Sequence, residues 1–117
     1  MEDKFIRNIF FYKNYFVEFY STLDQAVKLK FDWTLKLIAT TERIPVKYFK
    51  HIEVVLGLYE IRVEYSSDIY RVFWFFYKWK LIVVMNGFKK KSQKTPQKEI
   101  KIALAIKKQY FDEKESK

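Results

Sequence analysis

Apolar and polar residues follow a strand-like pattern over residues 58–88, in three runs with short polar breaks between them. The runs are residues 58–65, 69–77 and 80–88. They are rich in aromatic and β-branched side chains, which predicts an antiparallel meander of three strands. Two arginines, Arg62 and Arg71, stand inside strands whose other residues are mostly apolar. Charge in such a place suggests an anionic partner.

The pairing of the first two strands depends on the length of the turn between them. If Ser66 and Ser67 form a two-residue turn, Arg62 lies directly opposite Arg71. A three-residue loop would oppose Arg62 to Val72 instead, and no Asn-Gly dipeptide decides between the two.

With the shorter turn, the meander has one charged face and one apolar face, because side chains alternate along a strand. The charged face carries Glu60, Arg62, Glu64, Arg71, Phe73 and Phe75. The apolar face carries Ile61, Val63, Val72, Trp74 and Phe76. A second two-residue turn, over residues 78–79, places Asn86 opposite Arg71. It also adds Leu81, Val83 and Met85 to the apolar face, which we expect to form the core.

Two interpretations of the paired arginines stay open. Directly opposed like charges on a sheet repel each other, at a cost of some tenths of a kcal/mol. Glu60 and Glu64 could neutralise them as cross-strand or diagonal pairs. Alternatively, the guanidinium groups form a preorganised fork for phosphate, whose geometry they suit. Both interpretations can hold together.

The N-terminal half begins with a predicted strand over residues 5–12 and a short helix that places Tyr15, Phe16, Phe19 and Tyr20 at helical spacing. Residues 27–37 then alternate strictly, as in a strand. A helix also fits, because Val27, Phe31, Leu35 and Ile38 fall on one stripe and Leu29, Trp33 and Leu37 on an adjoining one. Pro45 breaks whatever precedes it, and one helical turn is expected before Gly57.

A basic segment follows the third strand, at the end of the sheet where Asn86 lies. It contains Lys89, Lys90, Lys91 and Lys94. Thr95 and Pro96 are typical of a helix start, as N-cap and first-turn proline. The helix they open has an apolar stripe of Ile100, Ala103, Leu104 and Phe111. Runs of lysine are usually solvated loops, but the position next to the arginine face favours a binding role.

Composition and charge narrow the class of protein. A chain of 117 residues, 50% hydrophobic and 21% aromatic, fits one folded domain over residues 1–117. The net charge is +9, which favours a polyanionic partner such as nucleic acid or, equally, a solubilising surface. Absence of cysteine fits a reducing cytoplasm. We expect no signal peptide and no membrane span, since charges interrupt every apolar run.

The sequence lacks the motifs of several kinds of active site. One histidine is present, His51, without a partner at ligand spacing, and there is no glycine-rich phosphate loop or nucleophile elbow. We therefore expect no metal and no cofactor. The remaining chemistry is binding, or catalysis by positioning and charge stabilisation. RNA cleavage by its own 2′-hydroxyl is such a reaction, because the substrate supplies the nucleophile.

The residues also resemble a known family. A Leu-Tyr-Glu-Ile-Arg strand, a Tyr-Arg strand and the segment Asn-Gly-Phe-Lys-Lys-Lys-Ser-Gln-Lys-Thr-Pro before a last helix are similar to the HigB branch of the RelE/ParE toxin superfamily. The similarity is close over residues 48–111. It implies an α+β fold with an N-terminal strand, two helices, an antiparallel meander and a C-terminal helix. Residues 24–42 would then be helical.

The same resemblance implies a function and a set of site residues. It implies a ribosome-dependent mRNA endonuclease that is held inactive by a helix-turn-helix antitoxin. Arg62 and Arg71 match the basic residues that grip the scissile phosphate. Lys89, Lys90 and Lys94 match the basic loop, which could contact ribosomal RNA or supply a proton. Glu60 and Tyr70 are candidates for proton transfer, although the predicted register turns Tyr70 away from the arginines.

Two other functions stay open at this stage. Some relatives in the superfamily inhibit DNA gyrase without cutting RNA. A plain basic nucleic-acid-binding module would share the charge and the sheet but would not arrest growth. In each case the expected partners are macromolecules, either mRNA and the ribosome or a protein target.

Overall fold

The computed structural model describes residues 6–44, 50–51, 55, 57–78, 81–90 and 95–115, with the backbone alone for Lys50, His51 and Lys90. Its elements are β1 (Asn8–Phe11), α1 (Tyr15–Ser21), α2 (Gln25–Thr40), β2 (Lys50–His51), β3 (Tyr59–Tyr65), β4 (Asp68–Tyr77), β5 (Leu81–Lys90) and α3 (Gln97–Glu115). The predicted α+β class is confirmed. Within these ranges, no helix is long and apolar enough to cross a bilayer.

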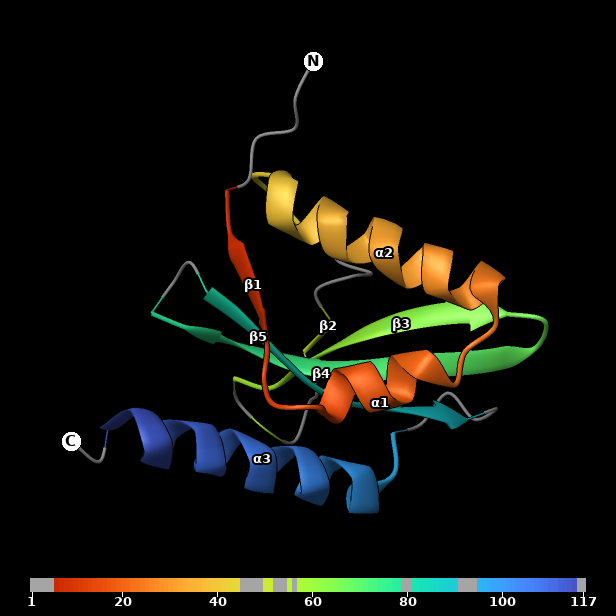
Figure 1. Cartoon of the computed structure of the whole chain (residues 1–117). Helices are drawn as coiled ribbons and strands as arrows, with labels where there is room; N and C mark the ends of the chain where they lie inside the picture. Colours follow the sequence, from red (N-terminus) through yellow and green to blue (C-terminus); the bar gives the residue numbers. More distant parts are fainter. Residues whose placement is uncertain are drawn as a thin grey trace.

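The strands form one five-stranded sheet in the order β1-β5-β4-β3-β2. The strand β1 runs parallel to β5, and the other pairs are antiparallel. Helices α1 and α2 cover one face of the sheet and α3 covers the opposite face (Figure 1). The predicted helical turn before Gly57 falls mostly outside the described residues, but Lys50–His51 pairs with β3 as a short strand.

Both faces of the sheet are therefore buried, where the sequence predicted one core. The first core, beneath α1 and α2, includes Phe31, Ile61, Val72, Trp74 and Val84. The second core, beneath α3, includes Phe73, Phe75, Val83, Ile100 and Tyr110. The second core occupies part of the face that was predicted to be charged.

The segment that could be strand or helix is the helix α2, as the resemblance implied. Its buried residues recur at helical spacing, with Val27, Phe31, Leu35 and Ile38 in the first core. The strict alternation in the sequence arises because a second apolar stripe lies on the same helix. Arg7 anchors the C-terminal end of α2 by donating to the carbonyl oxygens of Ile38, Thr41 and Glu42.

The pairing of β3 with β4 is as predicted from the two-residue turn. Tyr65 pairs with Asp68, and Arg62 lies opposite Arg71. Ser66 and Ser67 both have positive φ, 50° and 67°, which is the backbone that two-residue hairpin turns of this kind require.

The pairing of β4 with β5 differs from the prediction by one residue. Tyr77 pairs with Leu81, so the connection holds three residues instead of two, and an irregularity between Val72 and Trp74 shifts the register again. Arg71 consequently lies opposite Phe88, and the placement of Asn86 opposite Arg71 is wrong.

A shift of one residue moves every side chain of a strand to the other face. Leu81, Val83 and Met85 therefore pack in or against the second core, beneath α3, and not beside Trp74 as predicted. Ile82 and Val84 take their place in the first core.

Close packing of α1 on β5 depends on a glycine. A Cβ added at Gly87 would meet the ring of Phe19 at 2.5 Å, so any side chain there would push α1 away from the sheet. The helix α3 carries the predicted stripe, with Ile100 and Ala103 buried and Leu104 and Phe111 packed against the second core.

Candidate functional site

The charged residues of the sheet lie where the cover of α3 ends. Arg71, Phe73 and Phe75 alternate along β4 and so point to the same face. Ile100, Ala103 and Ile106 of α3 cover the two phenylalanines in the second core. Arg71 instead contacts Thr95, which precedes the first residue of α3.

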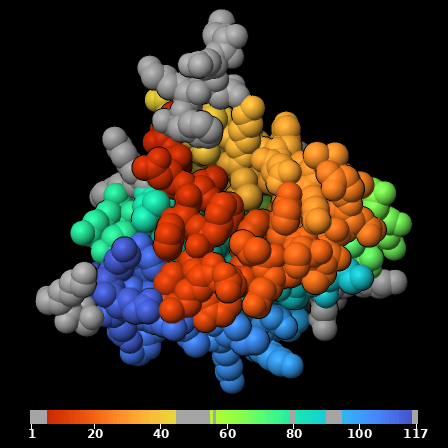
Figure 2. All heavy atoms as spheres, viewed as in Figure 1, coloured from red at the N-terminus to blue at the C-terminus, as the bar shows by residue number. Residues whose placement is uncertain are grey.

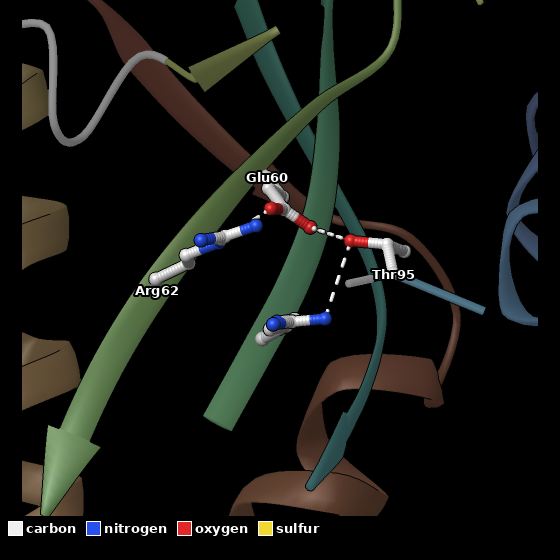
Figure 3. A network of polar contacts seen from close by, with 4 residues as sticks. Glu60, Arg62 and Thr95 are labelled. Carbon is white, nitrogen blue, oxygen red and sulfur yellow. Dashed lines mark hydrogen bonds and ion pairs between the residues drawn. The ribbon is translucent and has the colours of Figure 1, made fainter. Parts of the chain in front are cut away.

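Four side chains form a continuous polar network at this position (Figure 3). Arg62 donates from Nε to Oε1 of Glu60 over 2.6 Å. The hydroxyl of Thr95 donates to Oε2 of Glu60 over 3.0 Å and accepts from Nη1 of Arg71 over 3.3 Å. Glu60 thus lies between Arg62 and Thr95, and Thr95 links the carboxylate to the second guanidinium. We call these four residues the arginine cluster.

Arg71 is the most buried member of the arginine cluster, with none of its surface exposed. Its guanidinium carbon lies 5.9 Å from the ring centroid of Phe88, over the ring face. Burial lowers the pKa of Arg71, and the positive charge of Arg62 lowers it further. The carboxylate of Glu60 opposes both effects but contributes least. The pKa of Arg71 is therefore lowered by burial first and by the charge of Arg62 second.

Arg62 is the member that reaches the solvent. Its side chain is 20% exposed, whereas that of Glu60 is 1% exposed. The interpretation that Glu60 neutralises an arginine is confirmed for Arg62, in a pair two residues apart on one strand. Glu64 lies exposed further along β3.

Stability alone gives little reason to keep such a cluster. Removing charges from water costs several kcal/mol for each ion, and well-packed apolar residues of similar volume are often as stabilising or more so. On the same face of the sheet, two neighbouring positions of β4 are filled by buried apolar residues, Phe73 and Phe75. Buried charges with a shifted pKa are enriched at functional sites, and guanidinium groups suit phosphate oxygens.

The predicted lysines do not all join the arginine cluster. Lys89 pairs with Tyr70 on the other face of the sheet, where its Nζ lies 4.0 Å from Oδ2 of Asp68. The backbone of Lys90 pairs with that of Ile69. Both residues belong to β5 and not to a loop. Lys91 and Lys94 lie outside the described residues.

Two other predicted residues are placed by the sheet. Asn86 is partly buried in the irregular part of β5, and its Oδ1 is buried with no hydrogen-bond partner among the residues that the structure describes. Tyr70 is buried in the first core, so its expected orientation away from the arginines is confirmed.

Thr95 belongs to the site, although the sequence predicted a different role for it. It was predicted to cap α3, but the carbonyl of Pro96 accepts the first hydrogen bonds, from the backbone N–H groups of Glu99 and Ile100. The one sequence feature that could have indicated Thr95 as a site residue was its position in the Lys-Thr-Pro motif. Its partners Glu60 and Arg71 are 35 and 24 residues away, which no local pattern indicates.

The described residues contain no group of three or more histidine, cysteine, aspartate or glutamate side chains that could hold a metal ion. What the arginine cluster can do is bind an anion. A phosphate near Arg62 would also lie within the field of Arg71 and would offset the repulsion between the two arginines.

Residues 18–108 match the family described as phage-derived protein Gp49-like (DUF891). The matched segment covers more than three quarters of the chain and includes the whole arginine cluster. No curated protein matches the chain.

Proposed function

The chain belongs to the phage-derived Gp49-like family, a toxin family of the RelE/HigB type, and we propose that it is a HigB-type toxin that cuts translated mRNA on the ribosome. The observation that carries this proposal is the pair of arginines opposed on β3 and β4. Like charges that face each other across two strands favour an anion at this point of the sheet.

The proposed reaction is attack of a 2′-hydroxyl of the mRNA on the adjacent phosphorus. The 2′-hydroxyl releases its proton to solvent water as the 2′-oxygen–phosphorus bond forms. The phosphorus–5′-oxygen bond breaks and the 5′-oxygen takes up a proton, which leaves a 2′,3′-cyclic phosphate and a 5′-hydroxyl. Negative charge develops on the phosphoryl oxygens in the transition state. Donors aimed at such charge are worth about 2.7–4 kcal/mol each where they have been removed.

Arg62 is the donor that we assign to the phosphoryl oxygens, because part of its side chain is exposed. Glu60 holds the Nε of Arg62 and so orients its remaining N–H groups. Both carboxylate oxygens of Glu60 already accept hydrogen bonds, which favours positioning over proton transfer. Arg71 acts from beneath as a fixed positive charge. The N-terminal end of α3, with its positive dipole, begins close to Thr95.

The lysines of the basic segment take the remaining roles in the proposal. Lys90 is the last residue of β5, at the start of the basic segment, and we assign it to protonation of the departing 5′-oxygen. Lys89, Lys91 and Lys94 would contact phosphates of ribosomal RNA, where a net charge of +9 adds long-range attraction. The proposed place of action is the cytoplasm, where ribosomes translate, with an antitoxin as the neutralising partner.

Expression of the protein in bacteria tests the proposal. The wild type should arrest growth and produce discrete new 5′ ends within translated mRNA, seen by primer extension. Arg62→Ala should lose both effects while it keeps the fold. Arg43→Ala, which removes an exposed arginine far from the arginine cluster in sequence, should act like the wild type. Growth arrest with intact mRNA and damaged DNA would instead support gyrase inhibition.

A further inference from the structure

A pocket of about 280 Å³ lies between β1 and the C-terminal end of α3. It is lined by Phe10, Tyr12, Tyr110, Glu113 and Lys114, and we call it the tyrosine pocket. Pockets for drug-sized molecules have volumes of roughly 300–1,000 Å³, so this one suits a smaller ligand. Helix α3 extends over about 27 Å, at 1.5 Å per residue, and begins beside the arginine cluster (Figure 1). The tyrosine pocket is therefore separate from the arginine cluster.

The molecular surface near the pocket includes β1, which is drawn in red in Figure 2, next to the blue residues at the end of α3. The strand β1 is at the edge of the sheet, and Phe10 is 40% exposed. A ligand can therefore reach the tyrosine pocket from solvent.

The tyrosine pocket contains a buried polar group that the described part of the chain does not satisfy. Tyr110 is 1% exposed, and its hydroxyl is buried with no hydrogen-bond partner among the residues that the structure describes. Burial raises the pKa of Tyr110, so the hydroxyl keeps its proton at neutral pH and can donate. A buried hydroxyl without a partner destabilises the fold, and phenylalanine would avoid this cost. The hydroxyl therefore indicates a ligand with a polar edge.

Two charged side chains complete the lining of the pocket. Glu113 accepts a hydrogen bond from Tyr12 and pairs with Lys13 over 3.3 Å. The hydrogen bond from Tyr12, and to a lesser extent Lys13, lowers the pKa of Glu113, so its carboxylate is ionised at neutral pH. Each carboxylate oxygen has a second lone pair and can also accept from a ligand. The Nζ of Lys114 lies 5.6 Å from the ring centroid of Tyr110 and adds a positive charge.

The other acids near the end of α3 lie on a different side of the helix. Asp112 and Glu115 follow Lys108 at i+4 and i+7 and so share its stripe, and Asp112 pairs with Lys108 over 2.8 Å. Tyr110 and Lys114, spaced i and i+4, line the tyrosine pocket instead. An anion at Lys114 therefore meets the carboxylate of Glu113 as the one acid that lines the pocket.

These groups match a nucleotide better than other ligands. A nucleobase is flat and stacks on aromatic side chains, its edge forms hydrogen bonds, and its phosphate suits a lysine ammonium. A cationic ligand would be repelled, because Lys13 lies over the ring of Tyr12 and Lys114 over that of Tyr110. An apolar side chain of a protein would leave the hydroxyl of Tyr110 buried and unpaired.

We propose that the tyrosine pocket binds a guanine nucleotide, with the base on the rings, its adjacent N–H groups on Glu113 and its phosphate on Lys114. The nucleotide is either free or an unpaired residue of an RNA strand, since both offer the same base and phosphate. Binding of a free nucleotide is independent of the proposed function. Binding of an RNA strand rests on the proposed function and would give the protein a second RNA contact, at the far end of α3 from the cut.

The test is calorimetry on the full-length protein with three probes, guanosine monophosphate, the RNA UUGUU and the RNA UUUUU. Uracil has a carbonyl on each side of its one ring N–H, which the carboxylate of Glu113 repels. UUUUU should therefore bind at least about 5-fold more weakly than UUGUU, the effect of one lost base contact. Tighter binding of UUGUU than of the monophosphate indicates an RNA strand as the source, and equal binding indicates a free nucleotide.

Two neighbouring residues of β1 provide a matched pair of variants. Phe10 and Phe11 are 40% and 39% exposed. Phe10 lines the tyrosine pocket, whereas Phe11 stacks on Phe16, with the ring centroids 5.0 Å apart. Phe10→Ser should weaken binding of UUGUU or of guanosine monophosphate by about 5-fold or more, the effect of one lost stacking contact. Phe11→Ser should bind like the wild type.

The variant Tyr110→Phe distinguishes a ligand site from a purely structural tyrosine. It keeps the ring and removes the hydroxyl that has no partner among the described residues. Its melting temperature should therefore equal or exceed that of the wild type, while its affinity for the guanine probes should fall severalfold. A lower melting temperature with unchanged affinity would assign the hydroxyl to the fold.

Two outcomes would overturn the inference while the proposed function stands. The first is no binding of guanosine monophosphate together with equal binding of UUGUU and UUUUU. The second is equal binding of each probe to the wild type and to Phe10→Ser. Primer extension tests the proposed function separately, so a protein that binds the guanine probes through Phe10 but cuts no mRNA would keep the nucleotide site and contradict the proposed function.

Discussion

Two ends of one sheet face differ in what covers them. Phe73 and Phe75 on β4 lie under α3 and have no exposed surface. Arg71, on the same face of the same strand, lies beyond the start of α3 and is equally buried, but among Thr95, Phe88 and the charges of Arg62 and Glu60. Burial is the same at both ends, and the chemistry of the buried groups differs. The apolar end stabilises the fold, and the proposed function accounts for the cost of burying charge at the other end.

The largest expected effect on stability is at the apolar end. Phe75 packs against the rings of Tyr110 and Phe111, so Phe75→Ala should lower the free energy of unfolding by about 3–5 kcal/mol. Denaturant titration measures this loss. The folded fraction should cleave mRNA at the wild-type rate, because the arginine cluster is intact. Phe75→Leu, a milder change, should lower the free energy of unfolding by less and should also leave the cleavage rate of the folded fraction unchanged.

The next largest effect is expected from a variant that replaces buried charged residues of the arginine cluster with apolar ones. The double variant Glu60→Leu, Arg71→Met removes the buried carboxylate together with the fully buried guanidinium, and the remaining Arg62 is 20% exposed and can be hydrated. Its free energy of unfolding should equal that of the wild type or exceed it by about 1–4 kcal/mol. Cleavage of mRNA should fall at least about 100-fold, since charge stabilisation in the transition state is reduced.

The single variant Glu60→Leu is the control for this exchange. It leaves Arg62 and Arg71 without their carboxylate and should destabilise the fold by about 3–5 kcal/mol. A double variant that is less stable than this single variant would contradict the claim that the charged end is dispensable for the fold. A double variant that cuts mRNA normally would contradict its role in cleavage.

A smaller effect on stability and cleavage is expected at Thr95, where the start of α3 meets the arginine cluster. Thr95→Val keeps the volume of the side chain but removes the hydroxyl that joins Glu60 to Arg71. Stability should fall by about 1–3 kcal/mol, the cost of leaving buried groups without a partner. Cleavage should fall severalfold, because the guanidinium groups lose their alignment. Thr34→Val is the control, since Thr34 is also buried but donates only to the carbonyl of Lys30 on α2.

The smallest effect concerns the far end of α3, where Glu113 accepts a hydrogen bond from Tyr12 and pairs with Lys13 over 3.3 Å. These contacts lower the pKa of Glu113 from 4.5, the hydrogen bond from Tyr12 most of all. Since the folded pKa lies below the unfolded one, the stabilisation is present above pH 4.5 and is lost as the pH falls through the folded pKa.

Glu113→Gln should therefore lower the melting temperature slightly at pH 7, and the difference from the wild type should shrink in acid. A difference in melting temperature that grows as the pH falls would contradict the assignment.

The sequence predicted one of the two hairpins correctly and missed the other for a physical reason. Ser66 and Ser67 fit a two-residue turn, and the opposition of Arg62 and Arg71 follows from that turn length alone. The connection after Tyr77 has no turn signal, and the irregularity between Val72 and Trp74 breaks the regular alternation that the prediction assumed. The error placed Val83 on the wrong face and Asn86 opposite Arg71.

Other features depend on contacts between residues far apart in the chain. The alternation in residues 27–37 fits a strand and a helix equally, because α2 has two apolar stripes, and tertiary packing decides between the two. Thr95 looked like a helix cap because Thr-Pro is typical of one. Its place in the arginine cluster depends on where α3 meets the sheet.

The central claim is that the arginine cluster serves cleavage of RNA by its own 2′-hydroxyl. The most direct measurement uses ribosomes programmed with an mRNA that carries a single 2′-deoxynucleotide at the position of the cut. The purified wild-type protein should cut the all-ribose mRNA, leave a 2′,3′-cyclic phosphate, and leave the deoxy-substituted position intact. Equal cutting of both mRNAs, or no cutting of either, would contradict the claim.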